Sequence, residues 1–235
     1  MKPSRKSRFT AIAVSVATAS LSAAFAEPIY VENYSFEFDI APVGGVVETP
    51  PTGWISYYQT GSKDIGSQNP KDTQFTVNNP FAYPAEGNQF LYLNTFPENP
   101  NGVSGVYQTV GELMPNMTYT LTVAIGSRLD RLNTPGTISL VNGEDYTGTV
   151  LATGGGLPAV QDTWEDFSIS FTTGDTVEGY LTIVLSTVAA GTIQADFDNV
   201  RLDMVPVPEP STIASLMAAA GLGGLVLRRR RRAVE

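Results

Sequence analysis

Between residues 89 and 202 the chain is a series of short apolar and aromatic runs in which hydrophobic and polar residues often alternate. From Phe167 to Thr172 the phenylalanine and isoleucine residues alternate with serine and threonine. Such alternation places the apolar side chains on one face of an antiparallel strand. Gly, Pro, Asn and Asp separate the runs, and we find no long amphipathic helical stretch, so the pattern predicts an all-β domain. The seven clearest strands are predicted at residues 89–93, 105–110, 118–126, 136–141, 164–172, 180–186 and 194–202.

Two stretches lack this alternation. Residues 44–84 are interrupted by many prolines, and they are predicted to form long loops at one rim of the domain. Gly154–Gly156 is predicted to be a loop for the same kind of reason, because three consecutive glycines disfavour regular structure.

The first 26 residues have the pattern of a secretory signal peptide. Four basic residues precede Phe9, and the following run to Phe25 contains only apolar residues, serine and threonine. Ala24 and Ala26 form the small-residue cleavage signature, so the mature chain is predicted to begin at Glu27. An uncleaved membrane anchor is the alternative interpretation.

The C-terminal part has a second apolar segment, at residues 211–227, which carries no charge. As a helix it is about 25 Å long, near the lower limit for spanning a bilayer. The arginines at 228–232 keep that end in the cytoplasm, so the preceding residues are predicted to lie outside the inner membrane. We therefore expect one β domain at residues 27–205, followed by a tail at 206–232.

The predicted β domain is strongly acidic. Its five Lys and Arg residues against 21 Asp and Glu residues give a net charge of −16. Such a charge repels phosphate backbones, which argues against nucleic-acid binding. The chain also has no cysteine and no histidine, so disulfides, Ser-His-Asp triads and imidazole zinc sites are excluded.

The tail contains a short motif, Pro208-Glu209-Pro210, directly before the apolar segment and the arginines. This arrangement resembles a PEP-CTERM sorting tail, which is also recorded at the ends of some ice-binding-type surface proteins. The two prolines keep the motif extended, a form that a membrane-embedded enzyme can grip. The resemblance implies processing by an exosortase-type enzyme and delivery to the cell surface or extracellular matrix of a bacterium that makes exopolysaccharide. An ordinary single-pass anchor is the alternative, but it does not account for the Pro-Glu-Pro motif.

The β domain carries four short signatures in a fixed order. They lie at residues 33–37 with 53–54, at 87–93 with 106–110, at 164–172 and at 197–202. Together they resemble the family 4/9-type carbohydrate-binding modules of the galactose-binding-like superfamily. The resemblance covers nearly all of residues 31–203 and implies a single jelly-roll β-sandwich.

Domains of this kind commonly hold a structural calcium ion where the first and last strands meet. Carried over by position, the ligands implied are Glu37 and Asp198, with Asp196 or Glu32 as weaker ones. Calcium takes six to eight oxygen ligands, and a cation offsets the repulsion between neighbouring carboxylates. The alternative is that these acids lie in solvent at strand ends.

A sugar-binding face needs aromatic platforms, and Trp54, Tyr57 and Tyr58 are the candidates. The competing interpretation places Trp54 in the core. Tyr57 and Tyr58 are adjacent in sequence, so on a strand they would face opposite ways. Trp164 is predicted to lie in the core as well.

These features favour a non-catalytic exported surface or matrix protein that binds polysaccharide. A secreted glycoside-active enzyme is one alternative; it needs two carboxylates about 5–9 Å apart, and we find no paired-acid strand motif. A structural or ice-interacting adhesin is the other; it would favour a regular threonine array, whereas the threonines look scattered along this chain.

Overall fold

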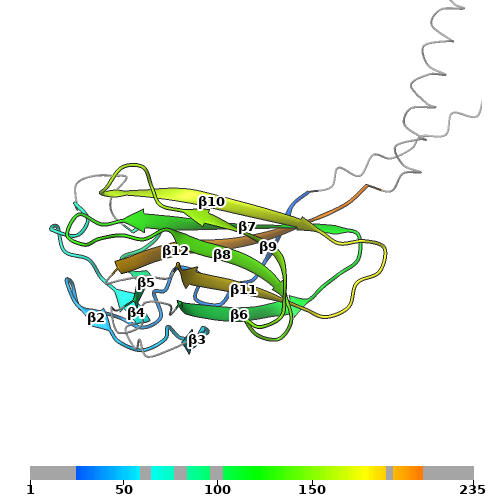
Figure 1. Cartoon of the computed structure of the whole chain (residues 1–235), viewed down its shortest axis with the longest axis horizontal. Coiled ribbons are helices and arrows are strands. Elements are labelled where there is room, and N and C mark those ends of the chain that lie inside the picture. Colours follow the sequence, from blue (N-terminus) through cyan, green and yellow to red (C-terminus); the bar gives the residue numbers. More distant parts are fainter. Residues whose placement is uncertain (1–24, 59–64, 77–83, 96–102, 189–192, 209–235) are drawn as a thin grey trace, which may run out of the picture. The chain divides into compact units, whose positions relative to one another are not determined.

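The computed structural model describes residues 25–58, 65–76, 84–95, 103–188 and 193–208. Residues Phe25–Val207 form one compact unit. All regular elements described in it are strands, and they form two antiparallel sheets packed face to face as a β-sandwich (Figure 1). The predicted all-β sandwich is therefore confirmed.

The first sheet, sheet A, has the strand order β10-β7-β12-β5-β4-β2, with β1 paired to β12. Its strands are β1 (Glu27–Ile29), β2 (Val46–Val47), β4 (Ile65–Gln68), β5 (Phe90–Thr95), β7 (Met117–Ser127), β10 (Thr163–Thr172) and β12 (Ile193–Pro206). The second, sheet B, has the order β3-β6-β11-β8-β9. Its strands are β3 (Ile55–Tyr58), β6 (Ser104–Glu112), β8 (Gly136–Asn142), β9 (Thr149–Gly156) and β11 (Tyr180–Thr187).

The seven strands expected from the alternating pattern are all present, as β5, β6, β7, β8, β10, β11 and β12. Their apolar residues meet between the sheets, where Leu91, Leu121, Ile183 and Phe197 are fully or almost fully buried in one continuous core. On β10, Phe167, Ile169 and Phe171 pack against this core as predicted. Burial of this apolar area is the main force that holds the two sheets together.

Two predictions about loops were wrong. The segment 44–84 contains the short strands β2, β3 and β4, and Gly154–Gly156 belongs to β9. In both places the backbone pairs with a neighbouring strand, so tertiary pairing overrides weak local propensity. β3 pairs with β6, and β9 pairs with β8 along its length.

β12 contains an irregularity that matters for the site. The register against β7 shifts between Asp198 and Arg201, and Asn199 there has a positive φ of 49°. A bulge of this kind inserts one extra residue and re-aims the side chains on either side. As a result Asp198, opposite Ala124, and Arg201, opposite Thr122, both lie on the outer face of sheet A.

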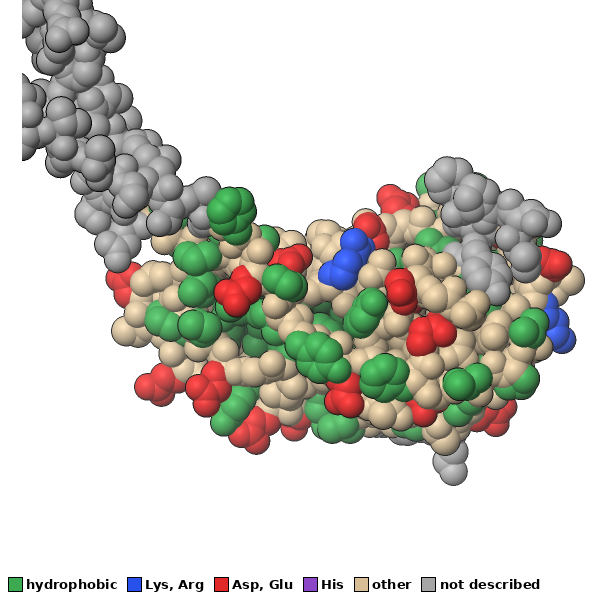
Figure 2. Space-filling view, turned by 180° about the vertical axis from the view of Figure 1, so that it is seen from behind, with side chains coloured by type: hydrophobic (Ala, Val, Ile, Leu, Met, Phe, Trp, Pro, Cys, Tyr) green, Lys and Arg blue, Asp and Glu red, His purple; other side chains and the backbone are tan. Residues whose placement is uncertain are grey.

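The surface of this unit is acidic. Figure 2 shows acidic side chains spread over the face it displays, with few basic side chains among them. This agrees with the excess of acids in the sequence.

Several predictions fall on residues outside the described ranges. They are the signal peptide up to Ala24, the Glu209-Pro210 part of the sorting motif, the apolar span 211–227 and the arginines 228–232. In the part of the chain that the structure does describe, no helix is long and apolar enough to cross a membrane.

Candidate functional site

Four strands of sheet A bring a row of chemically distinct residues together on its outer face. Trp164 on β10 is opposite Gly126 on β7, which is opposite Asp196 on β12, which is opposite Tyr92 on β5. Neighbouring strands are about 4.8 Å apart, so the whole row is compact. The row lies on the outer face because the alternate residues of these strands, such as Leu91 and Phe197, are in the core.

Aromatic rings surround this row. Phe75, Phe90 and Tyr92 are buried and pack with the half-buried Trp164 as a cluster separate from the main core. Phe75 stacks on Trp164 with ring centroids 5.1 Å apart, and Phe90 meets the same indole edge-on at 5.5 Å. Trp164 was predicted to lie in the core; it packs in this outer-face cluster instead. We call these four aromatic residues and Asp196 the aromatic–acid site.

Gly126 allows the indole to reach across the sheet. A Cβ atom at this position would lie 2.8 Å from the outermost carbon of the Trp164 ring system. The indole therefore leans over β7 towards β12, and any side chain at residue 126 would displace it.

Asp196 is fully buried in this row, between Gly126 and Tyr92. Its Oδ1 atom accepts a hydrogen bond of 2.6 Å from Gln194 Nε2. Its Oδ2 atom and the indole N–H of Trp164 are also buried, and neither has a hydrogen-bond partner in the part of the chain that the structure describes. Buried polar atoms without partners are rare and costly, and they are typical of sites that act on a bound group.

Burial raises the pKa of Asp196 to about 7. The nearby Arg128 guanidinium and the hydrogen bond from Gln194 lower the pKa, but by less than desolvation raises it. An aspartate with such a pKa is partly protonated near neutral pH, so it can donate a proton to a bound molecule.

A second buried acid, Asp198, lies two residues further along the same face of β12. Its Oδ2 atom accepts from the backbone N–H of Glu86 at 2.8 Å, and Oδ1 accepts from that of Asn199 at 2.7 Å. Burial raises the pKa of Asp198, and the negative charges of Glu86 and Glu37 raise it further, against the two hydrogen bonds. Glu37 and Asp198 therefore lie close enough to act on each other electrostatically.

The neighbouring Glu37 is also held by backbone groups. Its Oε1 atom accepts from the N–H of Asn88 at 2.7 Å and of Gln89 at 2.6 Å. Gly87, with a positive φ of 70°, makes this approach possible, because a Cβ atom there would lie 2.5 Å from the same oxygen.

These contacts bear on the predicted calcium ion. Both Asp198 oxygens and one Glu37 oxygen already accept backbone hydrogen bonds. Among the described residues no group of three or more acidic, cysteine or histidine side chains is placed to hold a metal ion. The described residues therefore do not support the predicted site, and we derive no step from a metal.

The predicted sugar platform is not formed by Trp54. That side chain is only 4% exposed and packs against Phe36 in the core, so its ring has no free face. Tyr57 is stacked on Tyr146 with centroids 3.9 Å apart, and burial raises the pKa of its phenol to about 12. Tyr58 lies on β3, and its side chain is outside what the structure describes.

A strip of hydroxyl groups lies on the same outer face, beyond the aromatic–acid site. On β7 and β10 the hydroxyls pair across the strands at 2.7–3.0 Å, as Thr118–Thr172, Thr120–Ser170 and Thr122–Ser168. Six hydroxyl side chains are therefore arranged in two parallel columns, which we call the hydroxyl strip. The expectation that the threonines are scattered was wrong at this place, because the pairing of β7 with β10 aligns residues about 50 positions apart.

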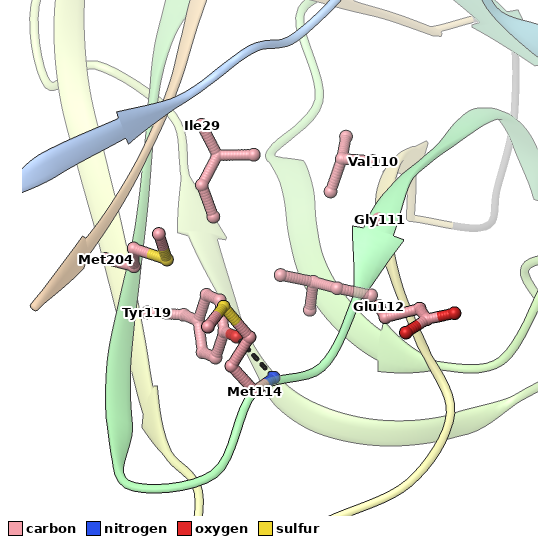
Figure 3. A pocket seen from close by; sticks show the side chains of 8 residues that line it. Ile29, Val110, Gly111, Glu112, Met114, Tyr119 and Met204 are labelled. Atoms are coloured by element: carbon pink, nitrogen blue, oxygen red, sulfur yellow. Dashed lines mark hydrogen bonds between the residues drawn. The ribbon is translucent and has the colours of Figure 1, made fainter. Parts of the chain in front are cut away.

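The sandwich also has an apolar pocket of about 170 Å³ between the sheets at one end. Figure 3 shows Ile29, Tyr119 and Met204 on one side and Val110 on the other, with the Glu112 carboxylate pointing away. The Tyr119 hydroxyl accepts a hydrogen bond of 2.8 Å from the Met114 backbone N–H. Among the described residues that line this pocket, no buried side-chain polar atom lacks a hydrogen-bond partner, so the aromatic–acid site is the stronger candidate.

Only part of this site could be predicted from the sequence. The sequence predicts Asp196 only as a weaker metal ligand, and Phe75 lies in the segment 44–84, which is predicted to form loops. The alternation of Phe90 and Tyr92 with the core residues Leu91 and Leu93 was the available signal, because it placed two aromatic rings on the outer face.

The tail matches a known sorting motif. Residues 206–232 match the PEP-CTERM protein-sorting motif, so the protein is an exported one that is sorted to the cell surface. No curated protein of similar sequence was found.

Solved structures share the fold of the β domain. The Stig cyclase Fisc from Fischerella sp. TAU, in complex with (3Z)-3-(1-methyl-2-pyrrolidinylidene)-3H-indole, superposes with a TM-score of 0.64 at 24% identity, covering 78% of this chain and 100% of that one. A cyclase from the same organism in complex with 4-(1H-indol-3-yl)butan-2-one gives 0.63 at 23% identity over the same shares. The carbohydrate-binding module TmCBM61, in complex with β-1,4-galactotriose, aligns with a TM-score of 0.46 at 14% identity, over 74% of this chain and 97% of that one.

The β domain also matches a family model. The model described as HpiC1 cyclase matches residues 27–203, which is well over half of the chain. The chain therefore belongs to the HpiC1-like cyclase family.

Proposed function

We propose that the β-sandwich binds a flat, ring-bearing small molecule at the aromatic–acid site and protonates it from Asp196, as the first step of a cyclisation. The observation that carries this proposal is the buried Asp196 carboxyl group, which has one oxygen without a partner among four aromatic rings. Rings bind flat apolar molecules, and the carboxyl group supplies the single polar contact and the proton.

The proposed step needs no other reactant. The proton moves from Asp196 Oδ2 to an unsaturated carbon or to nitrogen of the ligand, which becomes cationic, and a carbon–carbon bond closes the new ring. Loss of a proton from the cyclised cation returns a proton to the carboxylate, so that nothing is oxidised or reduced overall. The surrounding aromatic faces stabilise the intermediate cation.

Two findings support an aromatic nitrogen ring as the ligand class. The family is one of cyclases, and the two Fischerella structures that share this fold contain indole compounds. The non-catalytic role expected from the sequence differs from this proposal in one measurable way, since it requires no proton donor.

The first test is binding of 4-(1H-indol-3-yl)butan-2-one to the full-length protein. Asp196→Asn and Trp164→Leu are each expected to weaken binding about tenfold, the effect of losing one good polar or stacking contact. Isothermal titration calorimetry measures the affinities. Asp203→Asn on the same strand is the matched control and is expected to bind as the wild type does. Equal affinity of wild type and Asp196→Asn would overturn the proposal.

A second function, non-catalytic binding of a neutral polysaccharide, is favoured by the hydroxyl strip. Each hydroxyl pair uses one O–H donor and leaves the other donor and several lone pairs available for a partner. The strip carries no charge on an otherwise acidic domain, so it suits an uncharged, hydroxyl-rich polymer such as a neutral exopolysaccharide.

The two proposed functions are tested by different variants. In affinity electrophoresis through gels that contain either a neutral glucan or exopolysaccharide purified from the bacterium that makes this protein, the wild-type protein is expected to be retarded. The double variant Thr120→Val with Ser170→Ala is expected to lose this retardation, because it removes the central hydroxyl pair, whereas Asp196→Asn keeps it. Absence of retardation of the wild type on both polymers excludes the second function.

For the tail, we propose an inner-membrane anchor at residues 211–227 that an exosortase-type enzyme removes at the Pro208-Glu209-Pro210 motif. The PEP-CTERM match supports this proposal. Mass spectrometry of the protein released from the cell surface is expected to show a C-terminus upstream of Ser211, and Pro208→Ala with Pro210→Ala is expected to leave the chain full-length in the membrane. A released protein that still contains Leu227 contradicts the proposal.

A further inference from the structure

Arg128, which directly follows β7, is a buried cation beside the aromatic–acid site. Its side chain is only 3% exposed. The guanidinium donates to both oxygens of Asp130 at 2.9 Å, to Gln68 Oε1 at 2.8 Å and to Gln194 Oε1 at 3.1 Å. A buried arginine with four such bonds has a fixed position, because its planar fork matches all of these acceptors at once.

Gln194 connects this cation to Asp196. A guanidinium carries only donors, so the Gln194 amide must present its oxygen to Arg128. The amide nitrogen then points the other way, and it donates to Asp196 Oδ1 at 2.6 Å. Reversal of the amide would set donor against donor at Arg128 and is therefore unfavourable.

This arrangement makes the two oxygens of Asp196 different. Oδ1 is committed as an acceptor from Gln194, whereas Oδ2 has no partner in the described part of the chain. The other groups around Asp196 do not reverse this order. Arg128, Asp130 and Arg131 act on it electrostatically, Tyr92 is its neighbour on β5, and Gly126 on β7 has no side chain.

We propose that Arg128 is a positioning residue, which acts through Gln194 to hold Asp196 with Oδ2 as the oxygen presented to the ligand. This inference rests on the proposed function only in taking Asp196 as the group that meets the ligand. Arg128 itself touches no ligand. Its role is to fix which of two chemically equivalent oxygens faces the aromatic rings.

The test uses the two tryptophans of the chain as reporters. In the NMR spectrum of the full-length protein in detergent they give two indole N–H signals, and Trp54→Phe assigns the one from Trp164. Gln194→Met keeps the length of the side chain but removes the connection, so it is expected to move the Trp164 signal and to weaken binding of 4-(1H-indol-3-yl)butan-2-one about tenfold. Arg128→Met is expected to do the same. If it does not fold, Gln194→Met alone decides, because Arg128 keeps its ion pair with Asp130 in that variant.

Gln68→Met is the matched control. It removes another acceptor of the same guanidinium but leaves the bond between Arg128 and Gln194, so the Trp164 signal and the affinity are expected to stay as in the wild type. In an Asp196→Asn background, Gln194→Met is expected to weaken binding no further, because it acts through Asp196.

The outcomes separate the two proposals. If the wild type binds the probe while Gln194→Met binds equally well with an unmoved Trp164 signal, the positioning role is overturned and the proposed function survives. If the wild type binds no probe but Gln194→Met moves the Trp164 signal and Gln68→Met does not, the proposed function fails and the positioning role stands. A shift of equal size in Gln68→Met means that Arg128 is only structural, which also overturns the inference.

Discussion

Asp196→Asn is expected to resist urea better than the wild type at about pH 8, and to lose this advantage at about pH 4. The buried carboxyl group has a folded-state pKa of about 7, against an ordinary value of 3.8. Above pH 7 the folded protein must therefore keep a charge in an apolar surrounding, which costs about 4 kcal/mol relative to acid pH. Asparagine carries no charge at either pH, so this cost disappears.

The direction of the pH dependence follows from proton binding. Between about pH 4 and pH 7 the folded wild type holds a proton on Asp196 that the unfolded chain has released, so its stability falls as the pH rises through this range and levels off above it. The amide group of the variant leaves an N–H without a partner, at a cost of about 1–3 kcal/mol at every pH. The expected net gain at pH 8 is therefore about 1–3 kcal/mol, and at pH 4 the variant is the less stable protein.

Urea titrations followed by tryptophan fluorescence, repeated across this pH range, measure both quantities. Asp175→Asn is the matched control, because it removes one acid from an exposed loop and thus tests the general effect of lowering the negative charge. If the wild type and Asp196→Asn lose stability in parallel between pH 4 and pH 8, Asp196 does not have the raised pKa on which its proposed role as a proton donor depends.

The alternating pattern was sufficient to predict the long strands. From Met117 to Ile125 on β7 and from Phe167 to Phe171 on β10, every second residue is apolar and packs in or against the core, so the strands are visible without knowledge of their partners. β9 was missed because its last residues are glycines, which pair only because β8 lies beside them. The strands β2, β3 and β4 have two to four residues each, too few for a period of two to be recognised.

The site was less predictable than the fold for a related reason. Trp164, Gly126, Asp196 and Tyr92 come from four strands, and only the registers of three strand pairs place them in one row. A change of one residue in any register would move its members to the opposite face. Asp198 was more visible, because the closing signature at residues 197–202 marked it, although the described contacts give it a different role from the calcium ligand implied.

Asp198→Asn is expected to destabilise the protein at about pH 4 by about 1–3 kcal/mol. Both Asp198 oxygens accept backbone hydrogen bonds, from Glu86 and Asn199. A protonated carboxyl group keeps a lone pair on each oxygen, so it accepts both bonds even when it is neutral. An asparagine has only one oxygen, and its NH₂ group would face one of these N–H donors.

The deficit of Asp198→Asn is expected to shrink as the pH rises. Burial and the charges of Glu86 and Glu37 raise the pKa of Asp198 in the folded state, so the wild type alone loses stability once the unfolded chain releases its proton above about pH 4. Urea titrations at several pH values measure this, with Asp203→Asn as the control on the same strand. Two carboxyl groups of equal burial, two residues apart, therefore lose different contacts on the same substitution. The cause is whether the backbone saturates both oxygens, as it does for Asp198, or leaves one available to a ligand, as it does for Asp196. If Asp198→Asn were as stable as the wild type at pH 4, the backbone bonds to Asp198 would be absent in solution, and the distinction between a structural and a functional acid on β12 would be lost.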